Sequence, residues 1–322
     1  MSDSYTNLFR DKPVLVTGGA GFIGSHLCGA LCDLGAKVTV LDDLSAGKTE
    51  NLPHHSGLSF VQGSLLDIAM LHKAMGENEI IFHLAARGSV PMSVEHPVEF
   101  VHSNIIGTQN IMEAARRSKV QRVIFSSSSS VYGSNPIPWI ETMPTYPLSP
   151  YAATKAAGES LLRAYSSSYN IDTCCLRYFN IFGPRQNPDS AYAAVIAAFA
   201  KAALQNNKSI IYGDGLQSRD FTFVANAVHA NLLAAAHPTP LKGELINVGG
   251  GHPVTVLALA KMIGELSGNT NFTPEHRPIR AGDLKHSYAD LNKAKQLLNY
   301  QPIVDLQTGL TATLNWYQSN LK

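Results

Sequence analysis

The chain has 322 residues, a formal net charge of +1 and only 15% charged residues. This length predicts one large α/β domain with a smaller one, and the balanced charge excludes a polybasic surface for nucleic acid. The first thirteen residues contain several charges and no apolar run, so they are not a secretory signal, and the Ala-rich stretch 191–204 is too short to span a bilayer. We therefore expect a soluble, cytoplasmic protein with neither a membrane nor a nucleic-acid partner.

The cysteines and histidines do not form a recognisable metal site. Four cysteines, at positions 28, 32, 174 and 175, fit neither a disulfide framework nor a zinc pattern. Cys28 and Cys32 share one helix face, where two thiols without further ligands usually serve core packing. We therefore expect no bound metal.

The first motif that carries chemistry is a glycine turn. Residues 14–17 form a short β-rich run that leads into Gly-Gly-Ala-Gly-Phe-Ile-Gly-Ser at 18–25, and a helical pattern covers 26–34. Glycines 19, 21 and 24 have the dinucleotide spacing, and glycines 18, 21 and 24 fit a spacing of three. Such glycines let the backbone approach a pyrophosphate at a helix N-terminus, although an ordinary glycine turn is the alternative.

The next strand decides between these two interpretations. Residues 37–41 form a second β-rich run that ends at Asp42, 18 residues beyond Gly24, where an acid binds the adenosine ribose. Strand, glycine turn, helix and acid together favour a dinucleotide site. Because Asp42 and Asp43 repel a 2′-phosphate and no arginine lies near, NAD is favoured over NADP.

The central part of the chain places a serine run beside this turn. Strands are predicted at 58–62, 80–85 and 120–127, and a helix from Pro97 to about Ser118 has Asn104 near its middle. Ser126–Ser130 therefore fall at a strand's carboxyl end, on the same edge as the glycine turn. Five serines alone more often form a flexible loop, but the strand before them and Val-Tyr-Gly after them favour a catalytic element.

A tyrosine and a lysine four residues apart follow on a helix predicted from Tyr151 to about Tyr169. At this spacing the Lys155 ammonium lies close to the Tyr151 phenol, and we expect it to lower the pKa of that phenol. The hydroxyl of Ser128 is placed to relay the proton. With a hydride acceptor alongside, such a site oxidises an alcohol to a ketone.

The C-terminal part alternates between two regions. A sixth strand covers 174–179, an Ala-rich helix starts at Ala191, and a helix at 223–236 with a strand at 244–248 returns to the first region. We predict an α/β fold: a doubly wound parallel sheet (Rossmann) with a second, smaller α+β substrate-binding lobe. The NAD-binding domain covers 1–180 and is rejoined at about 220–250, and the discontinuous lobe occupies most of 181–322.

Four motifs in this order resemble a known family. They are the glycine turn, Ser-Ser-Ser-x-x-Val-Tyr-Gly, Tyr-x-x-x-Lys, and Leu-Arg-Tyr-Phe-Asn at 176–180. The chain resembles the extended short-chain dehydrogenase/reductase family from residue 14 to about 317. Within it, the chain is most similar to the UDP-sugar 4-epimerases, specifically the UDP-N-acetylglucosamine 4-epimerase group. The resemblance implies NAD as cofactor, a UDP-sugar substrate, a homodimer paired through the helices at Pro97 and Tyr151, and a role in nucleotide-sugar supply for polysaccharide biosynthesis.

The resemblance also implies roles for individual residues. The catalytic residues are Ser128, Tyr151 and Lys155. The cofactor-binding residues are Gly18, Gly21, Phe22, Ile23, Gly24, Asp42, Leu65, Leu84, Ala85, Ala86, Asn104, Tyr151, Lys155 and Tyr178. The substrate-binding residues are Ser89, Ser128, Ser129, Tyr151, Asn180, Val195, Arg219, Arg280, Asp283 and Ser287. The positive charges of Arg219 and Arg280 would balance the negative charge of the diphosphate.

Two positions narrow the expected reaction. Ser129 and Ser130 stand where related dehydratases carry an Asp-Glu pair, so the chain lacks the carboxylates that remove a C5 proton. By the resemblance, Ser287 occupies the position at which galactose-restricted epimerases carry a bulky tyrosine. The small side chain of Ser287 leaves room for an acetamido group on the sugar. These features favour reversible epimerisation of UDP-GlcNAc and UDP-GalNAc, with UDP-Glc and UDP-Gal as further substrates, through a transient 4-keto sugar.

The chain departs from the pattern of the N-acetylhexosamine epimerases at two positions, and the residues allow two alternative functions. Met92 replaces the arginine usual in the N-acetylhexosamine group, and Ser64 replaces a common aspartate near the adenine. A UDP-glucuronate 4-epimerase or another NDP-sugar-modifying member of the family is an alternative, in which Arg185 binds the carboxylate. A non-catalytic NAD-binding redox sensor or scaffold is another, disfavoured by the intact Ser128, Tyr151 and Lys155.

Overall fold

The structure is a computed structural model that describes residues 5–189, 194–269, 271–278 and 284–321. Its main part is a seven-stranded sheet in the order β11-β6-β5-β4-β1-β2-β3, and every pairing in it is parallel. The strands are β1 Pro13–Thr17, β2 Lys37–Asp42, β3 Leu58–Gln62, β4 Ile80–His83, β5 Arg122–Ser128, β6 Asp172–Tyr178 and β11 Glu244–Val248. The predicted doubly wound α/β fold is confirmed.

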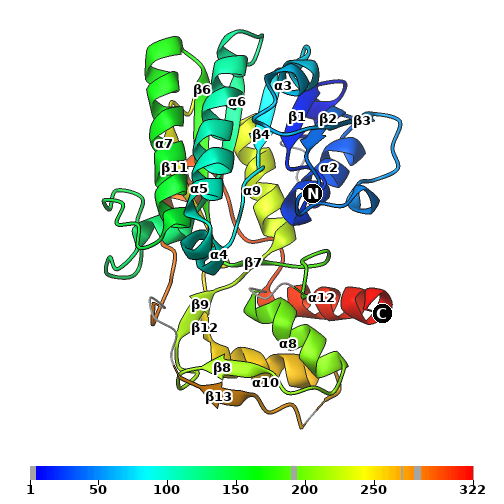
Figure 1. Ribbon diagram of the computed structural model, residues 1–322, viewed down its shortest axis with the longest axis vertical. Coiled ribbons are helices and arrows are strands. Elements are labelled where there is room, and N and C mark those ends of the chain that lie inside the picture. Colours follow the sequence, from blue (N-terminus) through cyan, green and yellow to red (C-terminus); the bar gives the residue numbers. More distant parts are fainter. Residues whose placement is uncertain (1–4, 190–193, 270, 279–283, 322) are drawn as a thin grey trace.

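Helices cover both faces of this sheet, which explains why its central strands are almost continuously apolar. One face packs against α2 (Phe22–Asp33) and α9 (Val224–Ala236), with the short helices α1 (Thr6–Phe9) and α11 (Asn292–Leu298) at its margins. The other face packs against α3 (Ile68–Met75), α6 (Gly107–Arg116) and α7 (Pro150–Tyr169). Figure 1 shows the sheet upright between these two layers.

Two boundaries differ from the prediction in a way that matters for the site. The helix predicted from Pro97 to about Ser118 is three consecutive pieces: α5 (Pro97–Phe100), a π-helical turn η2 (Val101–Ile106) and α6. Strand β4 ends at His83 rather than at Ala85. The residues after it therefore leave the sheet, and α4 (Val90–Glu95) follows them.

The second part of the molecule is built around α8 (Val195–Leu204), α10 (Val256–Leu266) and α12 (Leu306–Asn320), which share one apolar core. Three short pairs complete it: β7 (Ile181–Phe182) with β10 (Thr222–Phe223), β8 (Ile210–Tyr212) with β13 (Glu275–Arg277), and β9 (Ser218–Asp220) with β12 (Pro253–Thr255). This part lies below the sheet in Figure 1, at the carboxyl ends of the strands. The chain leaves the sheet after β6, returns for α9 and β11, and leaves again.

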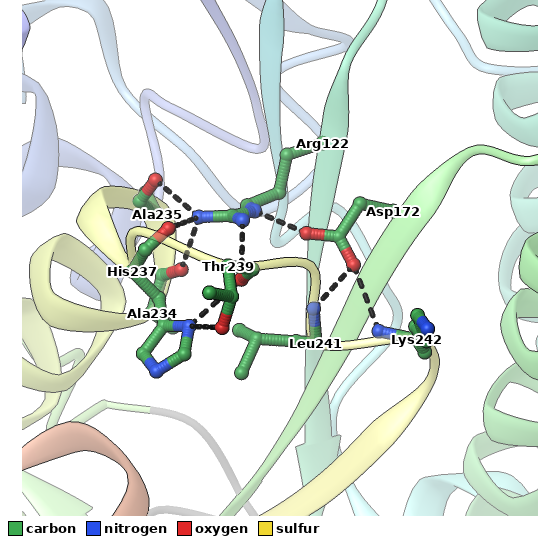
Figure 2. Close-up of polar contacts among 8 residues, drawn as sticks. All are labelled: Arg122, Asp172, Ala234, Ala235, His237, Thr239, Leu241 and Lys242. Atoms are coloured by element: carbon green, nitrogen blue, oxygen red, sulfur yellow. Dashed lines mark hydrogen bonds and ion pairs between the residues drawn. The ribbon is translucent and has the colours of Figure 1, made fainter.

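One ion pair fixes the place where the chain returns to the sheet (Figure 2). Arg122, at the start of β5, pairs with Asp172, at the start of β6. The Arg122 guanidinium also donates to carbonyl oxygens at and beyond the end of α9, those of Ala234, Ala235, His237 and Thr239. Asp172 accepts from the backbone N–H groups of Leu241 and Lys242. The pair therefore holds the α9–β11 connection against the edge of the sheet opposite the glycine loop.

All four cysteines are buried and unbonded to one another. Burial raises the pKa of the Cys32 thiol to about 11. Cys28 and Cys32 lie in the core under α2, as predicted from their shared helix face. Across the described ranges, no helix is both long and apolar enough to cross a membrane.

Candidate active site

The glycine turn after β1 packs so tightly that side chains are excluded. Gly18 has φ +69°, and a Cβ there would lie 2.7 Å from the backbone nitrogen of Ala85. A Cβ on Gly24 would lie 2.1 Å from the carbonyl oxygen of Gly18. Gly21 is the N-cap of α2 and provides no capping side chain, so the first N–H groups of α2, which have no intrahelical partner, are available to an anion. This geometry fits a dinucleotide pyrophosphate.

Asp42 stabilises this loop in addition to its predicted contact with a ribose. One carboxylate oxygen accepts from the backbone N–H of Ala20 at 3.0 Å, and the other accepts from that of Leu44 at 2.8 Å. Burial raises the pKa of Asp42, and these hydrogen bonds oppose the change. The ribose contact itself stays a prediction.

The remaining predicted cofactor residues surround the end of β4. Leu84, Ala85 and Ala86 follow His83, and Ala85 packs on Gly18. Leu65 is buried and packs closely on Gly107. A Cβ added to Gly107 would lie 3.0 Å from Leu65 Cδ1.

Asn104 is buried in the π-helical turn, and its side chain makes contacts that the sequence did not predict. Its Oδ1 accepts from Arg87 N at 2.8 Å, and its Nδ2 donates to Arg87 O at 3.1 Å. Nδ2 also donates to the Thr154 hydroxyl at 2.9 Å. Asn104 thus braces the loop after β4 against α7.

The structure brings Ser128 and Tyr151 together. Ser128 Oγ accepts from the backbone N–H of Ser130 at 3.2 Å and from its hydroxyl at 3.0 Å, at the start of the 3-10 turn η3 (Ser129–Tyr132). The Ser128 hydroxyl is then left to donate to the Tyr151 phenol, and this hydrogen bond lowers the pKa of Tyr151. Burial has the larger effect, so the pKa of Tyr151 is raised overall.

Lys155 lies beneath this pair and is only 3% exposed. Its Nζ donates to the carbonyl oxygen of Ser126 at 2.7 Å and lies 4.9 Å from the centre of the Phe125 ring. Burial lowers the pKa of Lys155 to about 8, against the opposing effect of Glu159.

The expected lowering of the tyrosine pKa by Lys155 is therefore wrong for the polypeptide by itself. The ammonium points to the strand end and lies 6.0 Å from the centre of the Tyr151 ring. Burial, which sequence spacing does not reveal, dominates the pKa of the phenol.

Tyr178, a predicted cofactor contact, lies opposite Ser128 in the β5–β6 register. Its side chain belongs to the core on the α2 and α9 face, and its hydroxyl accepts from Asn231 Nδ2 at 2.6 Å. Burial raises the pKa of this phenol. Only the edge and face of its ring remain for a cofactor contact.

Two predicted substrate residues from distant parts of the chain meet. Asn180, with φ +37°, donates through Nδ2 to Asp220 O at 2.9 Å and approaches Ser287 Oγ at 3.5 Å. Ser287 is 6% exposed and hydrogen-bonds through its backbone to Ser218 and Asp220 in β9.

Asp220 anchors this corner. It is fully buried and accepts from the backbone N–H groups of Gly250, Gly251 and Ala289. Burial raises the pKa of its carboxyl to about 6, although these hydrogen bonds oppose the change. The loop after β11 and the segment that carries Ser287 and Ala289 are therefore held by one carboxylate.

The other predicted substrate residues have varied surroundings. Arg219 donates through Nη1 to the carbonyls of Ser218 and Lys285 at 2.9 and 3.3 Å. Ser89 caps α4 by accepting from Met92 N, Ser129 begins η3, and Val195 begins α8. Arg280 and Asp283 lie outside the described residues.

The sequence did not predict a buried ion pair that lies next to the predicted catalytic residues. Glu159 accepts from Arg177 Nε and Nη2, both at 2.8 Å, and from the Ser127 hydroxyl at 2.5 Å. Arg177 also stacks over the Tyr132 ring at 4.5 Å. The signal was present: Glu159 follows Lys155 by four residues, and Arg177 interrupts an apolar strand.

Three or more His, Cys, Asp or Glu side chains do not converge on a metal position anywhere in the described part of the chain.

Comparison with known proteins agrees with this geometry. Residues 14–249 match the NAD dependent epimerase/dehydratase family. A UDP-glucose 4-epimerase of Mycolicibacterium smegmatis is 40% identical over 95% of this chain and 98% of its own length. The solved UDP-N-acetylglucosamine 4-epimerase of Methanobrevibacter ruminantium M1, in complex with UDP-N-acetylmuramic acid, is 41% identical, with a TM-score of 0.92 over 97% of this chain and 100% of that one.

A third relative carries a different sugar. It is a mutant UDP-glucuronic acid 4-epimerase of Bacillus cereus, solved with UDP-4-deoxy-4-fluoro-glucuronic acid and NAD. It is 34% identical, with a TM-score of 0.89 over 95% of this chain and 99% of that one. On the family match and these identities, the chain belongs to the NAD dependent epimerase/dehydratase family, and NAD is its cofactor.

Proposed function

We propose that this protein is a UDP-hexose 4-epimerase that interconverts UDP-GlcNAc and UDP-GalNAc, with UDP-Glc and UDP-Gal as further substrates. The observation that carries the sugar preference is the small, buried Ser287 beside Asn180. The 4-epimerase activity is supported by the Ser128, Tyr151 and Lys155 arrangement and by relatives that carry this activity in their names.

Tyr151 is the base that removes the proton of the sugar 4-hydroxyl. The Ser128 hydroxyl donates to the phenol oxygen, so it stabilises the phenolate form and passes the proton between phenol and sugar. Bound NAD supplies the hydride acceptor, and afterwards the hydride donor, for C4. Lys155 is held by the Ser126 carbonyl, with its ammonium 6.0 Å from the centre of the Tyr151 ring.

The strand end favours epimerisation over elimination. Ser129 and Ser130 follow Ser128 in η3, and the Ser130 hydroxyl is committed to Ser128. A hydroxyl is a poor acid and base near neutral pH, because its proton is lost far above that range. Nothing at these two positions removes a C5 proton, so the 4-keto sugar is reduced again rather than dehydrated.

The structure gives Arg185 a contact other than the one expected in the glucuronate alternative. Its Nη1 donates to Ser25 Oγ at 3.2 Å, in the first turn of α2, and the neighbouring Pro184 carbonyl hydrogen-bonds His26 Nε2 at 3.0 Å. This arginine is directed toward the dinucleotide loop, which speaks against a role in binding a uronate carboxylate. UDP-glucuronate is therefore the less favoured substrate, although a relative carries that activity in its name.

The test compares UDP-GlcNAc, UDP-GalNAc, UDP-Glc, UDP-Gal and UDP-glucuronate as substrates for the purified protein, with products separated by chromatography. We expect turnover of the first four, and selective loss of the acetylated pair in Ser287→Tyr. Ser287→Ala is the matched control, because it keeps the pocket small and should retain both acetylated substrates. Turnover of UDP-glucuronate alone would refute the proposed specificity, and NAD binding without any turnover would support the redox-sensor alternative.

We further propose a homodimer. Five exposed apolar side chains line the run from α4 to η2, those of Val90, Val94, Val98, Val101 and Ile106. A second copy of the chain would cover them, which is consistent with the expected pairing through this run and α7. A role in nucleotide-sugar supply for polysaccharide biosynthesis in the cytoplasm stays a prediction from the resemblance.

A further inference from the structure

A chain of buried polar side chains runs through the interior between the two cofactor loops and α6. Thr17, His83 and Thr108 come from β1, β4 and α6, and none is more than 1% exposed. Thr17 Oγ1 lies 2.8 Å from His83 Nδ1, and His83 Nε2 lies 3.0 Å from Thr108 Oγ1. Because the groups are out of reach of solvent, each must find its partner within this chain.

The flanking contacts fix the direction of every bond. The Thr108 hydroxyl donates to the carbonyl of Asn104 at 2.5 Å, so Thr108 Oγ1 can only accept from His83 Nε2–H. At the other end the Ala85 N–H donates to Thr17 Oγ1 at 3.3 Å, and His83 Nδ1 is the acceptor that the described contacts offer to the Thr17 hydroxyl proton. His83 is therefore a neutral imidazole with its proton on Nε2.

Its surroundings also disfavour the protonated form. Burial and, to a smaller extent, the Lys155 ammonium lower the pKa of His83 to about 3. The ring contacts Phe125, with ring centres 5.5 Å apart, and Phe125 also lies beneath Lys155. A second proton would face Thr17 and carry a charge with no counter-ion in these contacts.

The chain continues to the catalytic helix through Asn104. Besides its two bonds to Arg87, the Asn104 side chain donates to Thr154 Oγ1. The Thr154 hydroxyl in turn donates to the carbonyl of Tyr151 at 2.8 Å. Asn104 lies in the π-helical turn, a local geometry often found at functional sites. Its backbone carbonyl accepts a hydrogen bond from Thr108, and its side-chain amide donates one to Thr154.

We infer that His83 is a positioning residue, which joins the NAD-binding loops to the backbone of Tyr151 through this single directed chain of hydrogen bonds. One arm, through Thr17 and Ala85, sets the spacing of the two loops that enclose the cofactor. The other arm, through Thr108 and Asn104, sets the place of Tyr151 on α7. The inference rests on the proposed reaction only for its kinetic measurement.

Two substitutions of His83 test the two arms separately, because each variant retains the hydrogen bond of only one imidazole nitrogen. In His83→Gln the amide nitrogen is placed to donate to Thr108, and the acceptor for Thr17 is lost. In His83→Asn the amide oxygen is placed to accept from Thr17, and the donor to Thr108 is lost. We expect His83→Gln to speed NAD release from the holoenzyme roughly tenfold with kcat nearly unchanged, and His83→Asn to lower kcat roughly tenfold with NAD release nearly unchanged.

A purely structural role predicts another result. Both variants would then lose NAD retention and kcat together, in proportion to their loss of thermal stability, and that outcome would overturn the inference. Separate effects of the two variants at similar stability support it.

A spectroscopic measurement tests the tautomer without any reaction. In protein labelled with ¹⁵N-histidine, the His83 signals are identified by their absence in His83→Asn. We expect an Nε2–H pattern that does not change between about pH 5 and 8. An Nδ1–H pattern, or titration in this range, would overturn the inference, and because this readout needs no substrate, it is independent of whether the proposed function holds.

Discussion

The buried ion pair between Glu159 and Arg177 leads to a prediction about both stability and pH dependence. The Arg177 side chain is fully buried and that of Glu159 is 5% exposed. Glu159→Gln removes the negative charge and leaves Arg177 as a buried cation without the carboxylate that it pairs with. Nη1 of Arg177 already lacks a hydrogen-bond partner among the described residues.

Breaking such a pair costs far more than its presence contributes. Removing one partner of a buried ion pair typically destabilises a protein by about 3–5 kcal/mol, because the remaining charge is uncompensated. Whole domains are stable by only about 5–15 kcal/mol. We therefore expect a large drop in the midpoint of urea unfolding for Glu159→Gln. The double variant Glu159→Leu with Arg177→Met, which removes both charges, should recover most of the loss.

The same substitution changes the titration of Lys155. Burial lowers the pKa of Lys155 from 10.5 to about 8, and Glu159 opposes this change by raising the pKa. Without Glu159 that pKa falls, so Lys155 loses its charge at lower pH and the basic limb of kcat/KM should move to lower pH. Because the folded-state pKa lies below the unfolded one, the unfolded chain binds more protons between them, and this group makes stability rise with pH across that window.

Denaturation midpoints and pH–rate profiles of the three proteins provide the measurement. Glu113→Gln is the surface control: Glu113 pairs with Arg116 and Arg117 on the exposed side of α6, and its loss should change little. The reasoning fails if Glu159→Gln unfolds at the wild-type midpoint, or if the double variant is less stable than the single one.

Three further predictions concern other parts of the molecule. Arg122→Met removes the pair shown in Figure 2 and its bonds to the end of α9, so the unfolding free energy should fall by roughly 3 kcal/mol with no effect on KM; an unchanged midpoint would contradict this. Tyr151→Phe should bind NAD normally, but its kcat, measured by product formation, should fall at least about a hundredfold because the variant lacks the base. Turnover at the wild-type rate would exclude the proposed mechanism. Val98→Lys places a charge in the exposed apolar run and should shift the protein to monomer in light scattering, whereas Ile303→Lys should not; a monomeric wild type would contradict the dimer.

The parts of the structure that depend on local pattern were predictable from sequence. The glycine turn needs residues within a short segment, and β-rich runs of four to eight residues with intervening helical periodicity predict a parallel sheet. Strands β3 and β11 and helix α7 match their predicted bounds within one residue. Even the junction of Asn180 with Ser287 could be anticipated, but only from the resemblance.

Features that depend on burial or on distant partners could not be predicted. His83 looked like one more residue in an apolar strand, since its partners lie 66 and 25 residues away. The π-helical turn at Asn104 spans only 6 residues, which is too short for its i→i+5 bonding to be recognised in a hydrophobic pattern. The pKa of Tyr151 was expected to fall because spacing shows the charge of Lys155 but not the burial that opposes it.

The serine run is explained by the helix it faces. Tyr151, Lys155 and Glu159 are spaced by four residues, so they lie along one stripe of α7. Each meets a different serine of the strand end: the Ser128 hydroxyl, the Ser126 carbonyl and the Ser127 hydroxyl. Ser126 contacts Lys155 through its backbone carbonyl and hydrogen-bonds Tyr178 through its side chain, whereas Ser127 and Ser128 contact α7 through their hydroxyls. In the proposed mechanism Ser128 relays the proton, whereas Ser127 holds Glu159, whose charge raises the pKa of Lys155.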